Sequence, residues 1–192
     1  QGCPGCESAG SARGLVIAPG NKEIVDGVLW NGSFLDGSDT AGLLIAPTGT
    51  GRVSQLQLVN LRPAFTQNGP GVLIDTTGGG VVNGILSTNL NAGPNSEEGV
   101  KILGSNTKQI HFVNSRLSCN NTSNTGKSGA YVGSGVSNVT FIGGCSSTCS
   151  LQHPSTVNRQ TYGLEFASGA SNYVVQGMDL TGNVTGPILN TS

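Results

Sequence analysis

Residues 129–144 read GAYVGSGVSNVTFIGG, and this stretch contains the pattern that decides the fold. A glycine is followed by apolar side chains at alternate positions, Ala130 and Val132, then by a short turn and a second alternating segment at residues 139–141. Alternation at every second residue is typical of a β-strand that buries one face. The Gly, Ser and Asn residues between the two segments favour a tight turn, because they tolerate left-handed backbone.

The same template occurs six times along the chain. Its glycines are 28, 29, 28, 30 and 34 residues apart, at Gly14, Gly42, Gly71, Gly99, Gly129 and Gly163. The first and third residues after each glycine are apolar: Leu15/Ile17, Leu43/Ile45, Val72/Ile74, Val100/Ile102, Ala130/Val132 and Leu164/Phe166. A second strand is expected in each copy, at residues 24–29, 56–58, 81–86, 110–112, 139–141 and 173–175. A repeat of this length indicates a solenoid in which each copy forms one coil.

We therefore predict an all-β fold, a right-handed single-stranded parallel β-helix of about six coils. Residues 1–13 would form an N-terminal extension or linker, and residues 14–192 the β-helix domain. A β-sandwich is the structural alternative, but its strands would be joined by hairpins of varied length and would not share one template. No apolar stripe with helical spacing occurs, and glycine interrupts every candidate helix.

The composition limits the partners that the chain can have. Only 10% of the residues are charged and the formal net charge is −1, whereas about 25% are charged in an ordinary globular domain. Nothing in this balance favours nucleic acid or an anionic membrane surface as a partner. The apolar runs are also far too short for a transmembrane helix. We expect no nucleic-acid partner, no membrane insertion and no cofactor.

The five cysteines do not form an obvious disulfide framework, because their number is odd. Two close pairs occur, Cys3 with Cys6 and Cys145 with Cys149. They could be zinc ligands, local disulfides or inert thiols. Coils stack at about 4.8 Å, so the two pairs should lie too far apart to share one metal ion. We expect no metal site, and the disulfide question stays open.

Carboxylates are the candidates for catalysis, since hydrolysis of a glycosidic bond usually needs two of them on either side of that bond. Asp75 ends the first strand of the third copy, and Glu97 and Glu98 lie in the loop that leads to the fourth. These three are the predicted catalytic residues, with solvated turn residues as the alternative. His111 and His153 are interpreted as ordinary surface residues, because no activated nucleophile can be identified beside them.

The outward column of the first strands predicts a second kind of site. It contains one residue from each coil: Val16, Leu44, Leu73, Lys101, Tyr131 and Glu165. Its apolar half would be an exposed stripe on a monomer, which predicts an interface between copies of the chain. Its polar half, with the loop residues Asn120, Asn121 and Asn124, could stack on a sugar ring and hydrogen-bond its hydroxyls. The alternative is that these residues only solvate turns and loops.

The coil at residues 129–144 and the last coil at residues 163–183 resemble right-handed β-helices of the pectate-lyase-like superfamily, in particular those of bacteriophage tailspikes and tail fibres. The resemblance implies a homotrimer that binds host cell-surface polysaccharide, located in the virion or otherwise extracellular. Pectate lyases carry an Arg-x-Pro-x-x-Arg element and acidic calcium ligands, whereas Arg62-Pro63 stands here without flanking arginines. Calcium-dependent lyase chemistry is therefore not expected.

Three functional hypotheses follow. The leading one is a segment of a phage tail spike or fibre that recognises a surface glycan and has a structural role in the virion. The second is a polysaccharide depolymerase, a glycoside hydrolase or lyase that uses paired carboxylates. The third is a bacterial adhesin or secreted β-helix repeat. One β-helix template can serve all three classes, so the site must decide between them.

Overall fold

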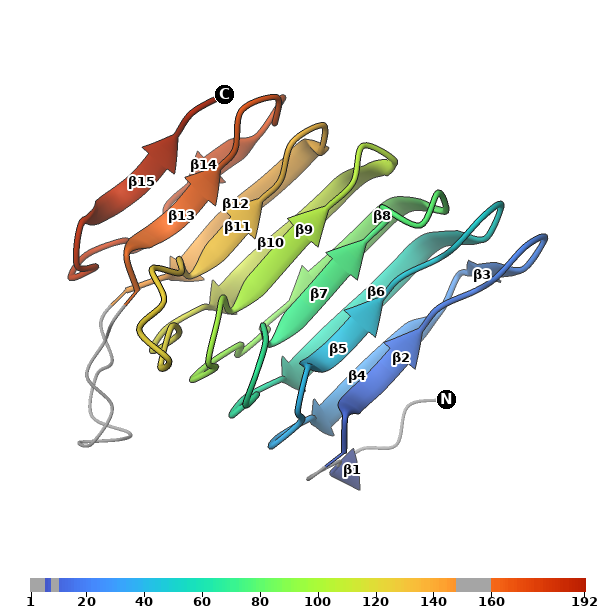
Figure 1. Ribbon diagram of the computed structural model, residues 1–192, viewed down its shortest axis with the longest axis horizontal. Helices are drawn as coiled ribbons and strands as arrows, with labels where there is room; N and C mark the ends of the chain where they lie inside the picture. The colour runs from blue at the N-terminus through green and yellow to red at the C-terminus, as the bar shows by residue number, and fades with distance from the viewer. Residues whose placement is uncertain (1–5, 8–10, 148–159) are drawn as a thin grey trace.

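The computed structural model describes residues 11–147 and 160–192 and, by backbone alone, residues 6–7. It is a right-handed parallel β-helix, in which the chain runs up one sheet, turns, and returns along a second sheet behind it (Figure 1). The predicted fold is confirmed. The described residues form no helix, and so none that could cross a membrane.

The front sheet in Figure 1 has seven parallel strands in the order β15-β13-β11-β9-β7-β5-β2. Its strands are β2 (Arg13–Ile17), β5 (Ala41–Ile45), β7 (Val72–Asp75), β9 (Val100–Leu103), β11 (Ala130–Val132), β13 (Tyr162–Phe166) and β15 (Gly186–Asn190). The first six are the predicted first strands of the six copies. The strand β15, which lacks the template, adds one further strand beside β13.

The second sheet also consists of parallel strands. They are β1 (Cys6–Glu7), β3 (Ile24–Asp26), β4 (Leu29–Phe34), β6 (Arg52–Arg62), β8 (Val81–Thr88), β10 (Thr107–Arg116), β12 (Ser137–Cys145) and β14 (Val174–Gln176). The predicted second strands are confirmed, but the central ones are longer than the sequence pattern indicated. The strand β1 pairs with β4, so part of residues 1–13 extends this sheet.

These strands are long because they bend around the core at residues with left-handed backbone. One such row contains Asn60, Asn89 and Asn114, with φ of 54°, 54° and 51°. Asparagine adopts this conformation more readily than most residues because its short side chain can hydrogen-bond locally. Here each side chain donates a hydrogen bond to the previous coil: Asn60 to Asn31 at 3.2 Å, Asn89 to Asn60 at 3.1 Å and Asn114 to Asn89 at 2.8 Å. We call these four residues the asparagine ladder.

The template glycines mark the place where the connecting loops fold over the front sheet. A Cβ atom on Gly99 would lie 2.6 Å from Nδ2 of Asn120 and 2.8 Å from the carbonyl oxygens of Ala92 and Gly129. A Cβ on Gly71 would lie 2.6 Å from Nδ2 of Asn95. Only a hydrogen atom fits at these positions, so the glycines are required by packing.

The loop side chains over the glycines form a second polar ladder, which we call the amide row: Asn95, Asn120, Gln160 and Asn183. Asn95 donates to Oδ1 of Asn120 at 3.0 Å, Asn120 donates to Oε1 of Gln160 at 3.2 Å, and Gln160 donates to Oδ1 of Asn183 at 3.0 Å. Buried amides without partners would be costly. The row satisfies them coil by coil and thereby fixes the loops against the sheet.

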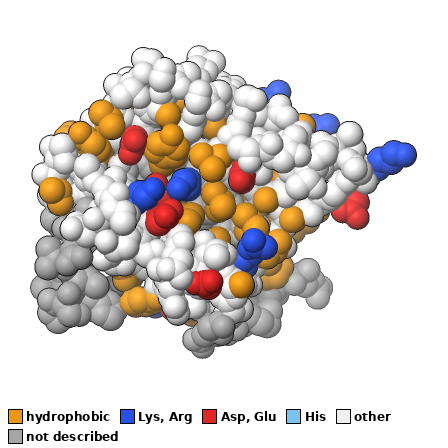
Figure 2. All heavy atoms as spheres, in the orientation of Figure 1, with side chains coloured by type: hydrophobic (Ala, Val, Ile, Leu, Met, Phe, Trp, Pro, Cys, Tyr) orange, Lys and Arg blue, Asp and Glu red, His pale blue; other side chains and the backbone are white. Residues whose placement is uncertain are grey.

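The outer face of the front sheet is shown in Figure 2. Hydrophobic side chains gather over β2, β5 and β7, and a small group of Lys or Arg and Asp or Glu side chains lies beside them. Most of the remaining surface in this view is uncharged. Because charge is scarce in the whole chain, the charged group on this face is the natural starting point for a functional site.

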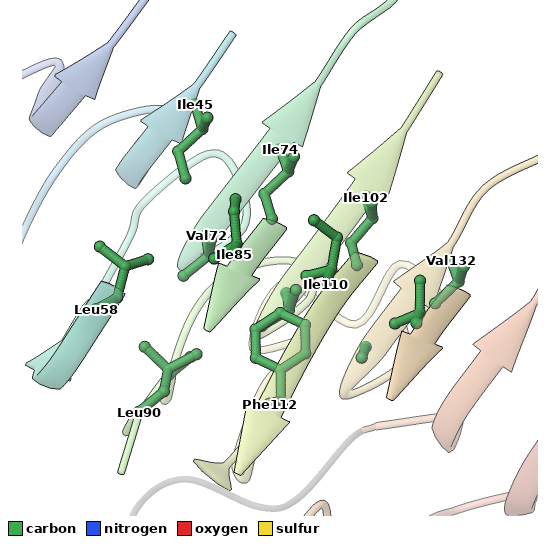
Figure 3. Packing of buried hydrophobic residues seen from close by; sticks show 14 of the residues in the cluster. Ile45, Leu58, Val72, Ile74, Ile85, Leu90, Ile102, Ile110, Phe112 and Val132 are labelled. Atoms are coloured by element: carbon green, nitrogen blue, oxygen red, sulfur yellow. The ribbon is translucent and has the colours of Figure 1, made fainter. Parts of the chain in front are cut away.

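The core lies between the two sheets and is continuous along the solenoid. Figure 3 shows its columns, in which Ile45, Ile74, Ile102 and Val132 of successive front strands face residues of the second sheet. Toward the C-terminal end the columns become aromatic: the rings of Phe112 and Phe141 stack with centroids 5.1 Å apart, and Phe141 meets Phe166 edge to face at 6.5 Å. Aromatic pairs of this kind add to the stabilisation from buried area.

Candidate functional site

The outward column of the front sheet is assembled as the sequence predicted. Strand pairing places Val16 beside Leu44, Leu44 beside Leu73, and Leu73 beside Lys101. Tyr131 then lies between Lys101 and Glu165. One residue of each coil therefore occupies the same outward position, and the column changes from apolar to polar and aromatic at Lys101.

The apolar half of this column is only in part the exposed stripe that was predicted. Val16 is 46% exposed, but Leu44 is only 8% exposed and Leu73 is half-buried. A loop reaches this part of the sheet, since a Cβ on Gly42 would lie 2.6 Å from Cβ of Pro63. The prediction was wrong at Leu44 because the repeat pattern contains no sign of where the loops fold. The exposed stripe is therefore interrupted at Leu44, and the interface between copies of the chain stays a prediction.

At the polar half, four charged side chains form a compact group, which we call the Lys–Glu cluster: Glu97, Glu98, Lys101 and Lys127. The Nζ atom of Lys101 lies 3.3 Å from Oε2 of Glu97 and 3.5 Å from Oε2 of Glu98. The Nζ atom of Lys127 lies 3.8 Å from Oε1 of Glu98. Glu98 thus binds two ammonium groups, one from β9 and one from the loop before β11.

Burial decides the electrostatics of this cluster. The side chain of Glu98 is only 4% exposed, and burial raises the pKa of its carboxyl above the ordinary value against the opposing attraction of Lys101 and Lys127. Burial by itself lowers the pKa of the Lys101 ammonium. The attraction of the Glu98 and Glu97 carboxylates is larger, so the pKa is raised above its ordinary value. Lys101 is therefore held as a cation at neutral pH, with its direction fixed by two carboxylates.

Tyr131 extends the cluster along the sheet. Its side chain is half-buried and lies on β11 between Lys101 on β9 and Glu165 on β13. The hydroxyl of Ser128 donates a hydrogen bond of 2.8 Å to Oε2 of Glu165, which holds that carboxylate in place. An aromatic ring with an oriented ammonium on one side and an oriented carboxylate on the other can contact both the faces and the hydroxyls of a sugar.

The three predicted catalytic carboxylates are not brought together as a set. Glu97 and Glu98 share Lys101, so their carboxylates lie closer than the upper limit of about 10 Å for a hydrolytic pair. The Lys101 ammonium contacts both of them, however, and Glu98 is almost fully buried. Asp75 forms no part of the cluster: Oδ1 accepts hydrogen bonds from the backbone and hydroxyl of Thr77 at 2.8 and 2.7 Å, as in a turn.

The loop asparagines Asn120, Asn121 and Asn124 were predicted to bind a sugar, but two of them are buried. Asn120 is fully buried in the amide row, and Asn121 is also buried, with Oδ1 accepting from the backbone of Thr125 at 2.7 Å. Both serve to fix the loop and are not accessible to a ligand. Asn124 is exposed and has a left-handed backbone with φ of 57°. Of the three, only Asn124 has the exposure that a role in binding requires.

Two residues of the site escaped prediction, Lys127 and Ser128. The sequence did contain a signal for their position. Lys127 and Ser128 directly precede the template glycine Gly129, just as Glu97 and Glu98 directly precede Gly99 in the previous copy. Residues at equivalent positions of adjacent coils stack. The alignment of copies therefore placed these two pairs side by side, as the contact of Lys127 with Glu98 confirms.

The structure decides the bonding state of two of the five cysteines. Cys145 is a free thiol and Cys119 is disulfide-bonded, so a local Cys145–Cys149 disulfide is wrong. Cys149, His153 and the side chains of Cys3 and Cys6 lie outside the described residues.

Arg62 stacks over the rings of Phe34 and Phe65, 5.6 and 5.8 Å from their centroids. Within residues 11–147 and 160–192, no three His, Cys, Asp or Glu side chains gather as metal ligands.

Comparison with known proteins agrees with the fold. The chain is similar to the A-module of the mannuronan C-5 epimerase AlgE4 of Azotobacter vinelandii, with a TM-score of 0.52 and 12% sequence identity. The similarity covers 96% of this chain and 56% of that structure, so the chain spans little more than half of the module's length. At this identity the likeness shows a shared parallel β-helix. No protein-family model and no curated protein sequence matches the chain.

Proposed function

We propose that the chain binds a polysaccharide along the outer face of the seven-stranded sheet, with Tyr131 as the contact for a sugar ring. The observation that carries the proposal is the position of Tyr131 in a row between Lys101 and Glu165, each of which is held by its own partners. Preorganised polar groups around an aromatic side chain are what a saccharide site requires, because they need not be ordered when the ligand binds.

A polysaccharide suits the geometry of this face better than a small isolated ligand. The row repeats at the coil spacing of about 4.8 Å, and it runs along the solenoid axis from Leu73 to Glu165. A linear chain lying along this axis could contact successive coils. The structural neighbour acts on a polysaccharide, as its name states, which supports the same class of ligand here.

The cluster favours binding over hydrolysis. In a hydrolase the scissile bond lies between two carboxyl groups. Here the Lys101 ammonium contacts both Glu97 and Glu98, and the latter has almost no exposed surface. The role proposed for these glutamates is therefore to orient Lys101 and Lys127.

The biological setting that we propose is a phage tail spike or fibre that recognises a host surface glycan as a homotrimer. Support for it comes from the resemblance of the coils at residues 129–144 and 163–183 to such tail proteins. Sedimentation of the purified chain tests the assembly, and a monomer at micromolar concentration would contradict it. A bacterial adhesin with the same site would bind the same class of ligand.

The binding proposal is tested with a glycan array followed by titration calorimetry on the best ligand. Tyr131→Ala should weaken binding about tenfold, the equivalent of about 1.4 kcal/mol, while Tyr131→Phe should retain most of the affinity. His111→Ala is the matched control, since His111 is an exposed outward ring on β10 of the other sheet. Equal binding by Tyr131→Ala and the control would refute the site, and release of reducing ends from the ligand would favour a hydrolase instead.

A further inference from the structure

The second sheet carries a polar cavity that has no part in the site above. It has a volume of about 430 Å³, and its lining includes Asp26, Arg52, Ser54, Gln55, Asn83 and Gln109. These residues come from β3, β6, β8 and β10, four neighbouring strands of the eight-stranded sheet. The cavity therefore lies on the outer surface of that sheet, whereas Tyr131 and Lys101 lie on the other one.

A bend in the strands creates the cavity. Gln55 and Gln109 have left-handed backbone, with φ of 50° and 58°, and Gly84 between them has φ of 88°. Because these three residues align in successive coils, each strand turns at the same place. Strand pairing brings Asp26, Ser54 and Asn83 into one row beside the bend, and Lys108 continues this row outside the lining of the cavity. The floor is thus a polar row, and amide side chains lie along its edge.

Asp26 and Arg52 are the two charged residues of the lining, and both are exposed. Asp26 and Arg52 line the same cavity but form no ion pair with each other, and within the described residues Arg52 has no ion-pair partner at all. A ligand group that lies between these two side chains could bond to both of them. Asn83 also lines the cavity, and its Oδ1 atom is buried without a hydrogen-bond partner.

The hydrogen-bonding pattern selects the chemistry of that group. Ser54 is 8% exposed and its hydroxyl donates to Oδ1 of Asp26, which fixes one carboxylate oxygen and leaves the other for a ligand. A hydroxyl group can donate to Asp26 while it accepts from Arg52, and bonds to charged partners are the stronger ones. A carboxylate or phosphate could pair with Arg52 but would be repelled by Asp26. The cavity contains no aromatic side chain in its lining.

We propose that this cavity is a second carbohydrate site, which takes a neutral sugar through hydroxyl groups held between Asp26 and Arg52. The site is independent of the polysaccharide face proposed above, because the two share no residue and lie on different sheets. A chain with saccharide sites on two sheets gains avidity only where both sites can be occupied by the same ligand or surface at once.

The test is a titration of the ¹⁵N-labelled chain, followed by NMR, with neutral hexose and N-acetylhexosamine oligosaccharides and with oligogalacturonate for comparison. A neutral probe should shift the side-chain amides of Gln55, Asn83 and Gln109, also in a Tyr131→Ala background. Arg52→Gln and Asp26→Asn should each weaken this interaction about tenfold, as expected for the loss of one charge-assisted hydrogen bond. The control is Arg13→Gln, which changes an exposed arginine outside the cavity.

Four outcomes would overturn the inference. The first is no shift at these amides with any neutral probe, and the second is unchanged affinity in both Arg52→Gln and Asp26→Asn with thermal unfolding as in the wild type. The third is a preference of the cavity for oligogalacturonate. Shifts confined to the surroundings of Tyr131 would likewise refute the second site while they support the function proposed for the front sheet.

Discussion

Replacing Gly99 by alanine should be among the most damaging single-methyl changes in this chain. The added Cβ would lie 2.6 Å from Nδ2 of Asn120 and 2.8 Å from the carbonyl oxygens of Ala92 and Gly129. Two of these three atoms belong to backbone that is fixed in adjacent coils, so they cannot move aside. Gly99 does not have a left-handed φ, and the cost of the substitution therefore comes from space alone.

The magnitude follows from two contributions. Forcing a methyl group into a packed position costs about 1–3 kcal/mol. Displacement of Asn120 would also disturb its hydrogen bonds to Ala92 at 3.0 Å and Gln160 at 3.2 Å, and a buried polar group without a partner costs about 1–3 kcal/mol. We expect a loss of about 3 kcal/mol or more. In a chain of this size that lowers Tm by about 6–12 °C.

The assay is thermal and urea unfolding followed by circular dichroism, with Gly186→Ala as the matched control. Gly186 begins β15 of the same sheet, but the atoms nearest to an added Cβ there are ring carbons of Tyr162 at 3.6 Å, an ordinary contact. The control should change the free energy of unfolding by less than about 1 kcal/mol. If Gly99→Ala were as stable as Gly186→Ala, the close packing of loop on sheet would not be the reason for the repeated glycine.

Three further predictions concern the ladders, the buried carboxyl and the core. Asn89→Ala should cost about 1–3 kcal/mol through lost ladder bonds and left-handed strain, whereas Asn89→Gly should cost less in the same urea titration because glycine tolerates this backbone. Since burial raises the pKa of Glu98 above 4.5, the folded chain binds this proton more tightly than the unfolded chain, and the contribution of Glu98 to stability should fall as the pH rises from 4.5 towards neutrality. Glu98→Gln should lack that slope, so the difference in free energy of unfolding between the wild type and the variant should change with pH over this range; parallel pH profiles would contradict the assignment. Phe141→Ala should cost about 3–5 kcal/mol, because its buried ring packs against both Phe112 and Phe166; calorimetry measures the loss, and a value below about 1 kcal/mol would show that the aromatic column is loosely packed.

Most of the fold could be predicted from the repeated template in the sequence. Alternation after each glycine sufficed to place Leu43, Ile74 and Val132 inside and Lys101 and Tyr131 outside, because side-chain direction in a strand has a period of two residues. The spacing of the glycines then put Lys101, Tyr131 and Glu165 in neighbouring coils. These contacts were predictable because they depend only on the register.

What could not be predicted depends on the connecting loops, whose lengths differ between coils. Leu44 is buried and Asn120 is inaccessible because of where these loops fold, and no periodicity in the sequence encodes that path. The left-handed bends at Gln55 and Gln109 were also invisible, since glutamine has no special preference for this conformation. The cavity beside them therefore emerged only from the structure.

The strand order has a consequence for how such a chain can change in length. Each strand of the front sheet pairs only with the same strand of the coils before and after it, so every coil is replaceable as a unit. Removal of residues 71–98, from one template glycine to the residue before the next, would bring Leu43 beside Val100 in the way that it now lies beside Val72. Duplication of the same segment would lengthen the rod by one step and repeat whatever side chains it displays. Growth and shortening by whole turns thus offer a route by which the length of this protein can be adjusted without redesign of its interior.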